Sequence, residues 1–261
     1  MPKRSTGEGA GKSSAPALTR GLRVLELLAR SDRALSLSAI YKALGIPLSS
    51  AHAICATLMS EGYVERRSDG TFDLSLKVLD LASSKISRYD IVEHFYEVCD
   101  ETPIIREHAA VISVLDGPDV LYIGSRTSPE PLGITFRIGM RLPACCTASG
   151  RAMLATMTDE EVKALYPEES LPQVTKLSTP TRTELLDILA QARQQGYATE
   201  KGGTRPHMYS YGAAIGGHGG RNTAVAVMLY EGDVTPEREL SVVDAVRELA
   251  RRLSRVSDIA S

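Results

Sequence analysis

Three side chains of this sequence are suited to act as nucleophiles: the adjacent cysteines Cys145 and Cys146, and Ser149 three residues further on. A thiol or hydroxyl nucleophile needs a base beside it, which His207 or His218 would have to supply. Ser149 does not stand in the Gly-x-Ser-x-Gly elbow of α/β-hydrolases, because the residue two places before it is not glycine. Adjacent cysteines in an apolar stretch more often belong to a core than to an active site. We therefore expect a protein that is not an enzyme.

The sequence has no pattern typical of a metal or nucleotide site. His94 and Cys99 are too far apart to share one helical face, and the histidines do not cluster. Residues 11–13 (Gly-Lys-Ser) end like a phosphate-binding loop, but Thr6 stands where that loop needs a glycine. We therefore expect no cofactor and no metal.

Residues 36–74 carry the clearest functional pattern. Two short stretches of helical period are separated by Gly-Ile-Pro at 45–47. We expect the first helix to follow a short strand and to be capped by Ser38, and the second to run from about Ser49 to Glu61 with Gly62 as its C-cap. The second helix would turn four residues toward a core: Ala51, Ile54, Cys55 and Leu58. Its other face is then free to meet a partner.

A basic hairpin is expected directly after these helices. Residues 63–67 and 71–74 alternate around Asp69 and Gly70, a pair that favours a type I′ turn. Helix, turn, helix and basic hairpin in this order predict a winged helix-turn-helix, whose second helix enters the major groove of double-stranded DNA while the hairpin lies along the phosphates. A small structural domain that binds protein is the alternative, and the order of these features favours DNA.

Length and composition are those of a globular protein with room for two domains. The chain has 261 residues, of which 43% are hydrophobic and 24% charged. No apolar run approaches the roughly 20 residues of a membrane span, and the N-terminus is polar where a signal peptide needs an apolar stretch. The four cysteines fit neither a zinc site nor a disulfide framework. We expect a cytoplasmic protein without membrane contact.

Charge is divided unevenly along the chain. Residues 1–90 hold 13 Lys and Arg against nine Asp and Glu, a net of +4, whereas the remainder holds 17 against 23, a net of −6. A basic head on an acidic body suits a module that binds a polyanion, attached to a domain that does not.

These patterns predict an α+β chain of four parts. We expect a disordered arm at 1–16, the winged helix-turn-helix at 17–75, linker helices at 76–101 and a mixed α/β domain at 102–261. In the last part, strands are expected at 108–115, 120–126 and 223–230, and helices at 148–156, 159–166, 183–195 and 235–256. The glycine run at 216–220 is typical of a hairpin turn.

In this order, the motifs resemble the IclR-type bacterial transcriptional regulators. The resemblance rests on six segments and covers the chain from about residue 17 to its end: 20–28, 43–47, 58–64, 139–143, 147–155 and 196–198. It implies a homodimer, often paired into a tetramer, that controls catabolic genes. It also implies that the C-terminal domain is a GAF-like α/β fold that holds a small organic effector.

The resemblance also implies where the effector binds. Matching positions place one wall of the effector site at Leu142, Ala148, Ser149 and Gly150, and the remaining contacts at Glu200, Ser210, Val227 and Leu229. Independently of the family, a helix that begins near Ala148 and Ser149 would offer free N–H groups to a carboxylate effector. A plain capping role for Ser149 remains open.

The chain departs from its relatives in both domains. Similar recognition helices carry Lys or Arg where this chain has Leu48 and Ala53, so base contacts are expected from Ser49, Ser50 and His52. Phosphate contacts are then expected from five cations: Arg20, Arg23, Lys42, Arg66 and Arg67. Apolar residues at Val227 and Leu229 favour a more apolar acid, aromatic or longer in chain, with Arg205 or His207 as its counter-group.

The effector is expected to change the spacing of the paired recognition helices through the helices at 76–101, because two-fold DNA readers match half-sites about 34 Å apart. A regulator that senses oxidants through Cys145 and Cys146 is the alternative, since thiols beside a helix start can have a lowered pKa.

Overall fold

The computed structural model describes residues 13–86, 91–128, 136–216 and 222–259, with the side chains of 83–86 and 256–259 left out. Most of the predicted N-terminal arm and of the glycine-rich turn at 216–220 therefore lies outside the described residues. The chain divides into two units, Met1–Arg88 and Tyr89–Ser261, and each is described by itself.

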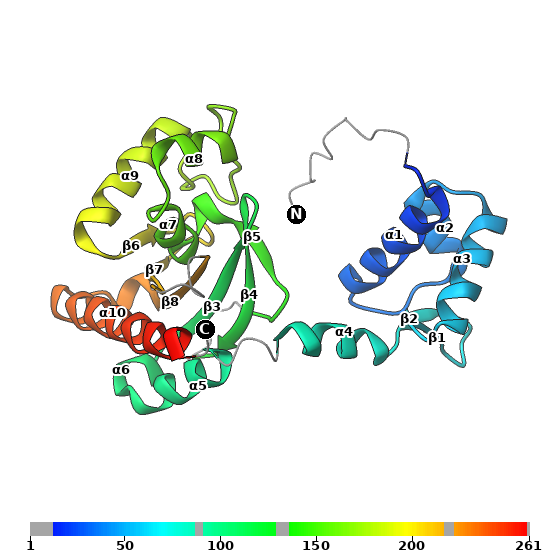
Figure 1. Cartoon of the computed structure of the whole chain (residues 1–261), viewed down its shortest axis with the longest axis horizontal. Coiled ribbons are helices and arrows are strands. Elements are labelled where there is room, and N and C mark those ends of the chain that lie inside the picture. The colour runs from blue at the N-terminus through cyan, green and yellow to red at the C-terminus, as the bar shows by residue number, and fades with distance from the viewer. Residues whose placement is uncertain (1–12, 87–90, 129–135, 217–221, 260–261) are drawn as a thin grey trace. The chain divides into compact units, whose positions relative to one another are not determined.

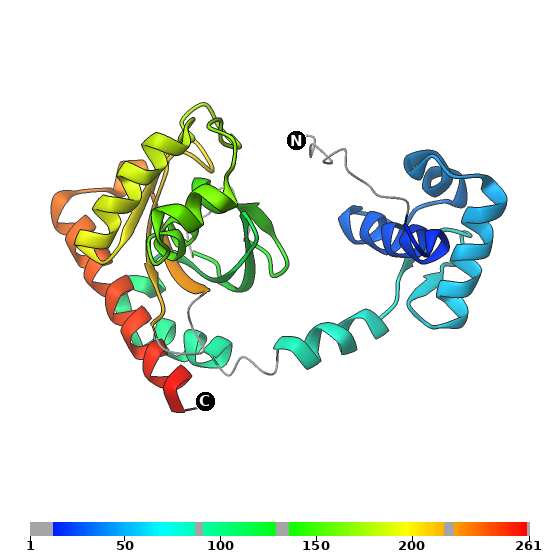
Figure 2. The ribbon, with the colours of Figure 1, turned by 45° about the horizontal axis from the view of Figure 1, so that its top comes forward.

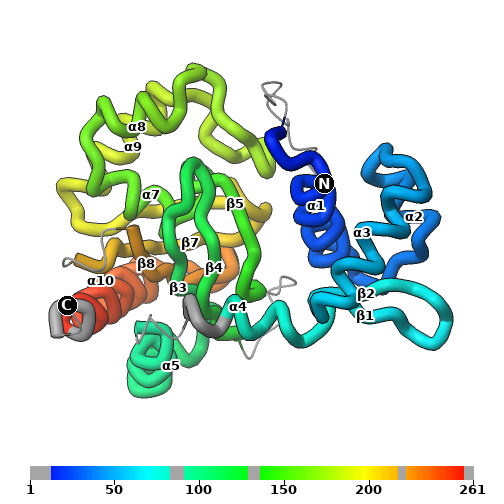
Figure 3. Tube along the Cα trace, turned by 45° about the vertical axis from the view of Figure 1, so that its right-hand side comes forward, coloured from blue at the N-terminus to red at the C-terminus, as the bar shows by residue number. Residues whose placement is uncertain are grey.

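The first unit consists of helices and one hairpin (Figures 1 and 3). Its elements are α1 Pro16–Arg30, α2 Leu37–Leu44, α3 Leu48–Ser60, β1 Val64–Arg66, β2 Phe72–Leu74 and α4 Lys77–Ile86. The bend between α2 and α3 is 115°, across a three-residue turn, as in other helix-turn-helix motifs. A small core joins α1, α2, α3 and the hairpin through Val24, Leu28, Ile40, Cys55, Val64 and Phe72.

Two local predictions for this unit are wrong. The cap of α2 is Ser36, whose Oγ accepts a hydrogen bond from the Ala39 N–H at 3.2 Å, whereas Ser38 lies inside the helix. The hairpin turn is not type I′, because Gly70 has a φ of 81° but Asp69 does not take a positive φ. The Gly70 N–H instead bonds the Arg67 carbonyl, which gives a longer loop with glycine in the left-handed position.

Among the described residues, no single helix is long and apolar enough to span a membrane. The bent pair α2 and α3 together reaches that length and apolar composition.

The second unit is built on an antiparallel sheet in the order β5-β4-β3-β8-β7-β6. Its strands are β3 Ala109–Asp116, β4 Asp119–Arg126, β5 Arg141–Pro143, β6 Ala198–Lys201, β7 Met208–Ala214 and β8 Thr223–Tyr230. Its α-helices are α5 Ile91–Glu101, α6 Pro103–Arg106, α7 Ala148–Leu154, α8 Asp159–Leu165, α9 Arg182–Gln195 and α10 Pro236–Ile259. Short 3₁₀ turns cover Ala144–Cys146 and Glu231–Asp233.

Helices cover both faces of the sheet (Figures 1 and 2). Helices α7, α8 and α9 pack on one face, and α5, α6 and α10 on the other. Strand β8 shows the division, because Ala224, Ala226 and Met228 belong to the first core while Val225, Val227 and Leu229 belong to the second. Successive side chains of a strand point to opposite faces, so one buried strand serves two cores.

The predicted fold class, a winged helix-turn-helix followed by an α/β domain, is confirmed. The two helices that were predicted as one linker belong to different units of the structure. Helix α4 belongs to the first unit, whereas α5 belongs to the second, where Phe95 and Cys99 are fully buried. The edge strands β5 and β6 and the inner strand β7 were not among the predicted strands.

Helix α7 lies unusually close to the sheet, which requires glycine at residue 212. A Cβ added at Gly212 would lie 2.5 Å from the carbonyl carbon of Ala148 and 2.8 Å from the Ser149 nitrogen. We therefore expect Gly212→Ala to lower the free energy of unfolding by about 1–3 kcal/mol, the usual cost of overpacking a core. Urea denaturation measures this change. In the control Gly216→Ala, the added Cβ meets only the Ser254 Oγ, at 3.6 Å, so stability should stay near wild type; equal stability of both variants would contradict the close packing.

Candidate functional site

The exposed residues of α3 include polar and apolar side chains but no Lys or Arg. Ser49 and His52 are exposed and Ser50 is half-buried, while Ala51 and Cys55 face the core as predicted. A helix without cations can contact bases only through neutral groups, so its attraction to phosphate must come from neighbouring elements.

Those neighbouring elements present the predicted cations. Arg20 and Arg23 on α1 and Lys42 on α2 are exposed and have no ion pair among the described residues. In the hairpin, the guanidinium of Arg66 stacks over the Phe72 ring, whereas Arg67 pairs with Asp73. Arg66 is therefore the hairpin cation more available to a phosphate.

In the second unit, most of the predicted effector contacts lie on the face of the sheet that α7 covers. Glu200, Ser210 and Met228 form a row across β6, β7 and β8. Leu142 packs against the same core from β5, and Ala148 and Gly150 are buried in α7. The structure thus brings six of the eight predicted residues to one face: Leu142, Ala148, Ser149, Gly150, Glu200 and Ser210.

Glu200 is a buried carboxylate with a full set of donors. Its oxygens accept hydrogen bonds from the Gly203 and Thr204 N–H groups, the Thr204 hydroxyl and the Ser210 hydroxyl, the last at 3.3 Å. Burial raises the pKa of Glu200, and these hydrogen bonds oppose the shift. Ser210 is thereby held toward the interior of this face.

Ser149 does not cap α7. The cap is Thr147, whose Oγ accepts a hydrogen bond from the Gly150 N–H at 3.0 Å. The Ser149 Oγ is fully buried and has no hydrogen-bond partner among the described residues. Ser113 on β3 has a second such hydroxyl, and its register partner Ala224 places it on the same face of the sheet. Buried hydroxyls are normally hydrogen-bonded, so these two hydroxyls make this face a candidate site for a polar ligand.

Val227 and Leu229 point to the opposite face of the sheet, into the core beneath α10, so the structure does not bring these two predicted effector contacts together with the other six. Ala226 and Met228 occupy the corresponding positions on the α7 face. A shift of one residue moves a side chain to the other face of a strand, and a short sequence motif does not fix that register.

Two further residues of this face were not predicted. Tyr122 on β4 is buried in the same core, and burial together with the charge of Glu200 raises the pKa of its phenol. Ser113 carries the unpartnered hydroxyl already described. Alternation along β3 and β4 was the available signal for both.

The cysteine pair lies in the core beside α7. The Cys145 and Cys146 sulfurs are 3.8 Å apart, and the hydrogen bond from the Cys145 thiol lowers the pKa of Cys146 to about 7. Both side chains are 0% exposed, so an oxidant cannot reach them in this conformation. All four cysteines are free, and the described residues contain no cluster that could hold a metal ion.

His207 lies away from the candidate effector site. Its side chain is 67% exposed and its Nδ1 lies 2.7 Å from a carboxylate oxygen of Glu231. His207 is therefore not the counter-group for a buried acid, and of that pair only Arg205 remains a prediction.

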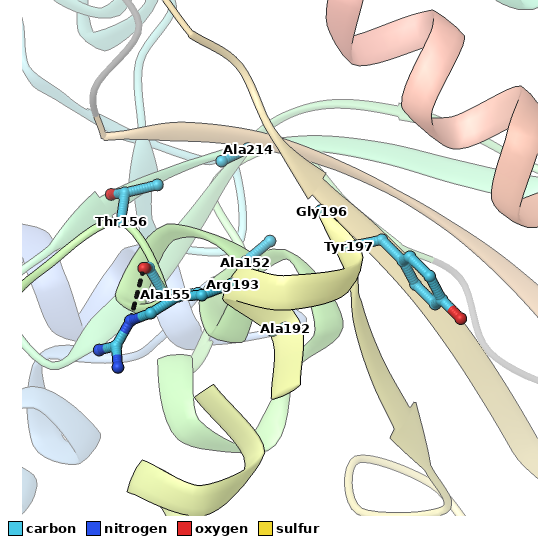
Figure 4. Close-up of a pocket in the computed structure, with 8 residues that line it drawn as sticks. All are labelled: Ala152, Ala155, Thr156, Ala192, Arg193, Gly196, Tyr197 and Ala214. Atoms are coloured by element: carbon cyan, nitrogen blue, oxygen red, sulfur yellow. Dashed lines mark hydrogen bonds between the residues drawn. The ribbon is translucent and has the colours of Figure 1, made fainter. Parts of the chain in front are cut away.

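A separate cavity of about 260 Å³ lies between α7 and α9 (Figure 4). Small side chains such as Ala152, Ala192 and Ala214 line it. Its one charged lining residue, Arg193, donates to the carbonyls of Ala155 and Met157 and so serves as a cap for α7. The Tyr197 ring points away from Arg193 in Figure 4. The charged group of this cavity is therefore already engaged in the structure of the chain.

A winged helix-turn-helix with free cations, joined to an α/β domain, defines the class of two-domain DNA-binding transcriptional regulators. Two family models match the chain: "Bacterial transcriptional regulator IclR C-terminal" over residues 83–255 and "IclR helix-turn-helix domain" over residues 17–68. The chain belongs to the IclR family of transcriptional regulators. It is a DNA-binding regulator and not an enzyme, as the sequence predicts.

Relatives and solved structures agree with this assignment. The chain is 25% identical over 251 residues to the HTH-type transcriptional repressor AllR of Salmonella paratyphi A, a match that spans 95% of this chain and 92% of AllR. The repressor BlcR of Agobacterium tumefaciens is 31% identical, with a TM-score of 0.61 over 94% of this chain and 98% of BlcR. An IclR homolog of Microbacterium hydrocarbonoxydans, complexed with 4-hydroxybenzoate, shares the fold at 22% identity and a TM-score of 0.78, over 92% of this chain and all of that one.

Proposed function

We propose that this chain controls catabolic genes in the cytoplasm as a homodimer or a tetramer, and that a small organic acid, aromatic or longer in chain, sets its affinity for operator DNA. The observation that carries this proposal is the buried Ser149 hydroxyl, which has no partner among the described residues, on a face shared with Glu200 and Ser210. A carboxylate could accept a hydrogen bond from that hydroxyl. The apolar neighbours Leu142, Tyr122 and Met228 suit the ring or chain of the acid.

The ligand class is tested by isothermal titration of the full-length protein with 4-hydroxybenzoate and with short oxo-acids. The 4-hydroxybenzoate of the Microbacterium homolog is one representative of the aromatic class. Binding of aromatic or longer-chain acids supports the proposal. Binding of short oxo-acids alone would contradict the apolar assignment.

On the DNA side, we propose that Ser49, Ser50 and His52 contact base edges and that the exposed cations hold phosphates. The lack of Lys and Arg on α3 supports this division of roles. Neutral side chains specify bases, whereas cations supply affinity that depends on salt.

Arg66→Ala should weaken DNA binding by about the same factor for every sequence and lower the salt slope of binding by about one per subunit, because one phosphate contact is lost. Fluorescence anisotropy with a specific and an unrelated duplex at several salt concentrations measures both quantities. Lys163 is an exposed residue of α8, so Lys163→Ala is the control that removes one positive charge outside the hairpin. An unchanged slope for Arg66→Ala would remove the hairpin from the interface.

A second copy of the chain is proposed to cover the apolar surface of the first unit. Leu18 and Leu22 on α1 are 64% and 54% exposed, and Leu76 and Leu79 at α4 are 79% and 60% exposed. Such leucines favour burial in an interface between copies, and a two-fold dimer matches the symmetry of a palindromic operator. Ligand binding would then change the spacing of the recognition helices, with a coupling of about 1–3 kcal/mol.

The cysteine pair supports a second candidate function, sensing of oxidants. The 3.8 Å between the sulfurs and the lowered pKa of Cys146 favour it, whereas their complete burial opposes it. Hydrogen peroxide should change operator affinity in the wild type but not in Cys145→Ser or Cys146→Ser if this function holds. An equal response in all three proteins would exclude it.

A further inference from the structure

A cavity of about 250 Å³ lies where α9 meets the edge strand β6 and residues 177–179, beside Arg151 of α7. Gln191 and Gln195, one turn apart on α9, stand at its exposed side, and Arg151 forms its inner wall. Among the described residues that line this cavity, none is acidic. We call it the Arg151 pocket.

Arg151 is a buried cation that makes only neutral hydrogen bonds. The residue is 6% exposed. Its guanidinium donates hydrogen bonds to the Cys145 carbonyl, the Thr199 carbonyl and the Thr179 hydroxyl, each at 2.8 Å. It has no ion pair within 4.0 Å among the described residues. A guanidinium has five N–H groups and keeps its proton in proteins, so two N–H groups are left without an acceptor in the described part of the chain.

Arg151 interacts with the charge of the buried Glu200 without forming an ion pair with it. An anion in the adjoining cavity would supply the direct partner that a buried charge favours. The planar fork of a guanidinium matches the oxygens of phosphate and carboxylate groups. The amides of Gln191 and Gln195 add neutral donors at the entrance.

We propose that the Arg151 pocket binds a small oxyanion, such as phosphate or the phosphate or carboxylate group of a metabolite, as a second ligand. Its walls are formed by α9, β6 and residues 177–179, and it shares none of the residues predicted to hold the effector. Arg151 connects it to that site, because its acceptors Cys145 and Thr199 adjoin the start of α7 and Glu200. Oxyanion binding would therefore affect the walls of the effector site.

The test is isothermal titration of the full-length protein with inorganic phosphate, sulfate and acetate at constant ionic strength. We expect saturable binding of at least one oxyanion. The double variant Gln191→Glu/Gln195→Glu, which introduces negative charge at the exposed entrance and leaves the core untouched, should weaken this binding about tenfold or more. Gln194→Glu adds one negative charge on the same helix outside the pocket, against two in the double variant, and its effect should stay below about twofold. Arg151→Gln should abolish binding if it folds.

Three results would overturn the proposal. One is the absence of saturable binding for all three anions. Another is binding that Gln191→Glu/Gln195→Glu and Gln194→Glu change equally. If acetate binds in the effector site instead, Ser149→Ala would weaken acetate binding and the glutamine variants would not. Acetate binding that responds only to Ser149→Ala would also overturn the proposal. Phosphate preferred over acetate assigns the pocket to phosphoryl groups, and the reverse assigns it to carboxylates.

Discussion

The triple variant Arg20→Ala/Arg23→Ala/Lys42→Ala should lower the affinity for operator DNA by about 10³-fold or more at moderate salt. A dimer would lose six phosphate contacts, and each contact contributes about 0.9 to the slope of log affinity against log salt. Because α3 has no cation of its own, Arg66 and Arg67 of the hairpin are the only predicted phosphate contacts that remain. Anisotropy titration of the DNA upstream of the chain's own gene, at 50–200 mM salt, measures affinity and slope together.

A matched control separates this effect from a general change in charge. Arg106→Ala/Lys163→Ala/Lys176→Ala removes three exposed cations from the second unit. It should keep wild-type affinity within a few-fold, and circular dichroism should show both variants folded. Equal losses in the two triple variants would show that the net charge, and not the helical face of the first unit, holds the DNA.

Ser149→Ala should weaken binding of the acid ligand by about 10- to 150-fold, which corresponds to the roughly 1.5–3 kcal/mol of a hydrogen bond to a charged group. The same change should leave the stability of the ligand-free protein unchanged or slightly raised, because it removes a buried hydroxyl that has no partner among the described residues. Isothermal titration with the acid that binds the wild type, combined with urea denaturation without ligand, measures both effects. Most core substitutions lower stability, so this combination is specific to a ligand-binding role.

Two controls accompany this variant. Tyr211→Phe removes a buried hydroxyl from the opposite core, and ligand affinity should not change. Thr147→Ala removes the cap of α7 and should cost about 1 kcal/mol of stability. Wild-type ligand affinity in Ser149→Ala would exclude this hydroxyl from the effector site.

Local signals made the first unit predictable. The helix-turn-helix is set by helical period, a Gly-Ile-Pro break and an alternating hairpin, all within about 40 residues. The prediction of the α2 N-cap was wrong because two neighbouring serines are both able to cap the helix. Both Ser36 and Ser38 can cap a helix. The start of α2 is fixed by the pairing of Leu35 with Phe72, two residues that are far apart in sequence.

The second unit was less predictable because its site depends on pairing between distant strands. Glu200 and Ser210 were predicted from matching motifs, and they lie side by side because β6 and β7 pair in that register. Val227 and Leu229 were predicted in the same way but lie on the opposite face, since one residue of register decides which core a side chain enters. Nothing in the sequence marks Arg151 as buried, because its acceptors come from segments about 30 and 50 residues away.

The most direct test of the account is titration of the full-length protein onto the duplex upstream of its own gene, at several salt concentrations, with and without the bound acid. The account predicts association that weakens steeply with salt and an affinity that the acid changes by about 5- to 150-fold. The absence of salt-sensitive association with any double-stranded fragment would contradict it.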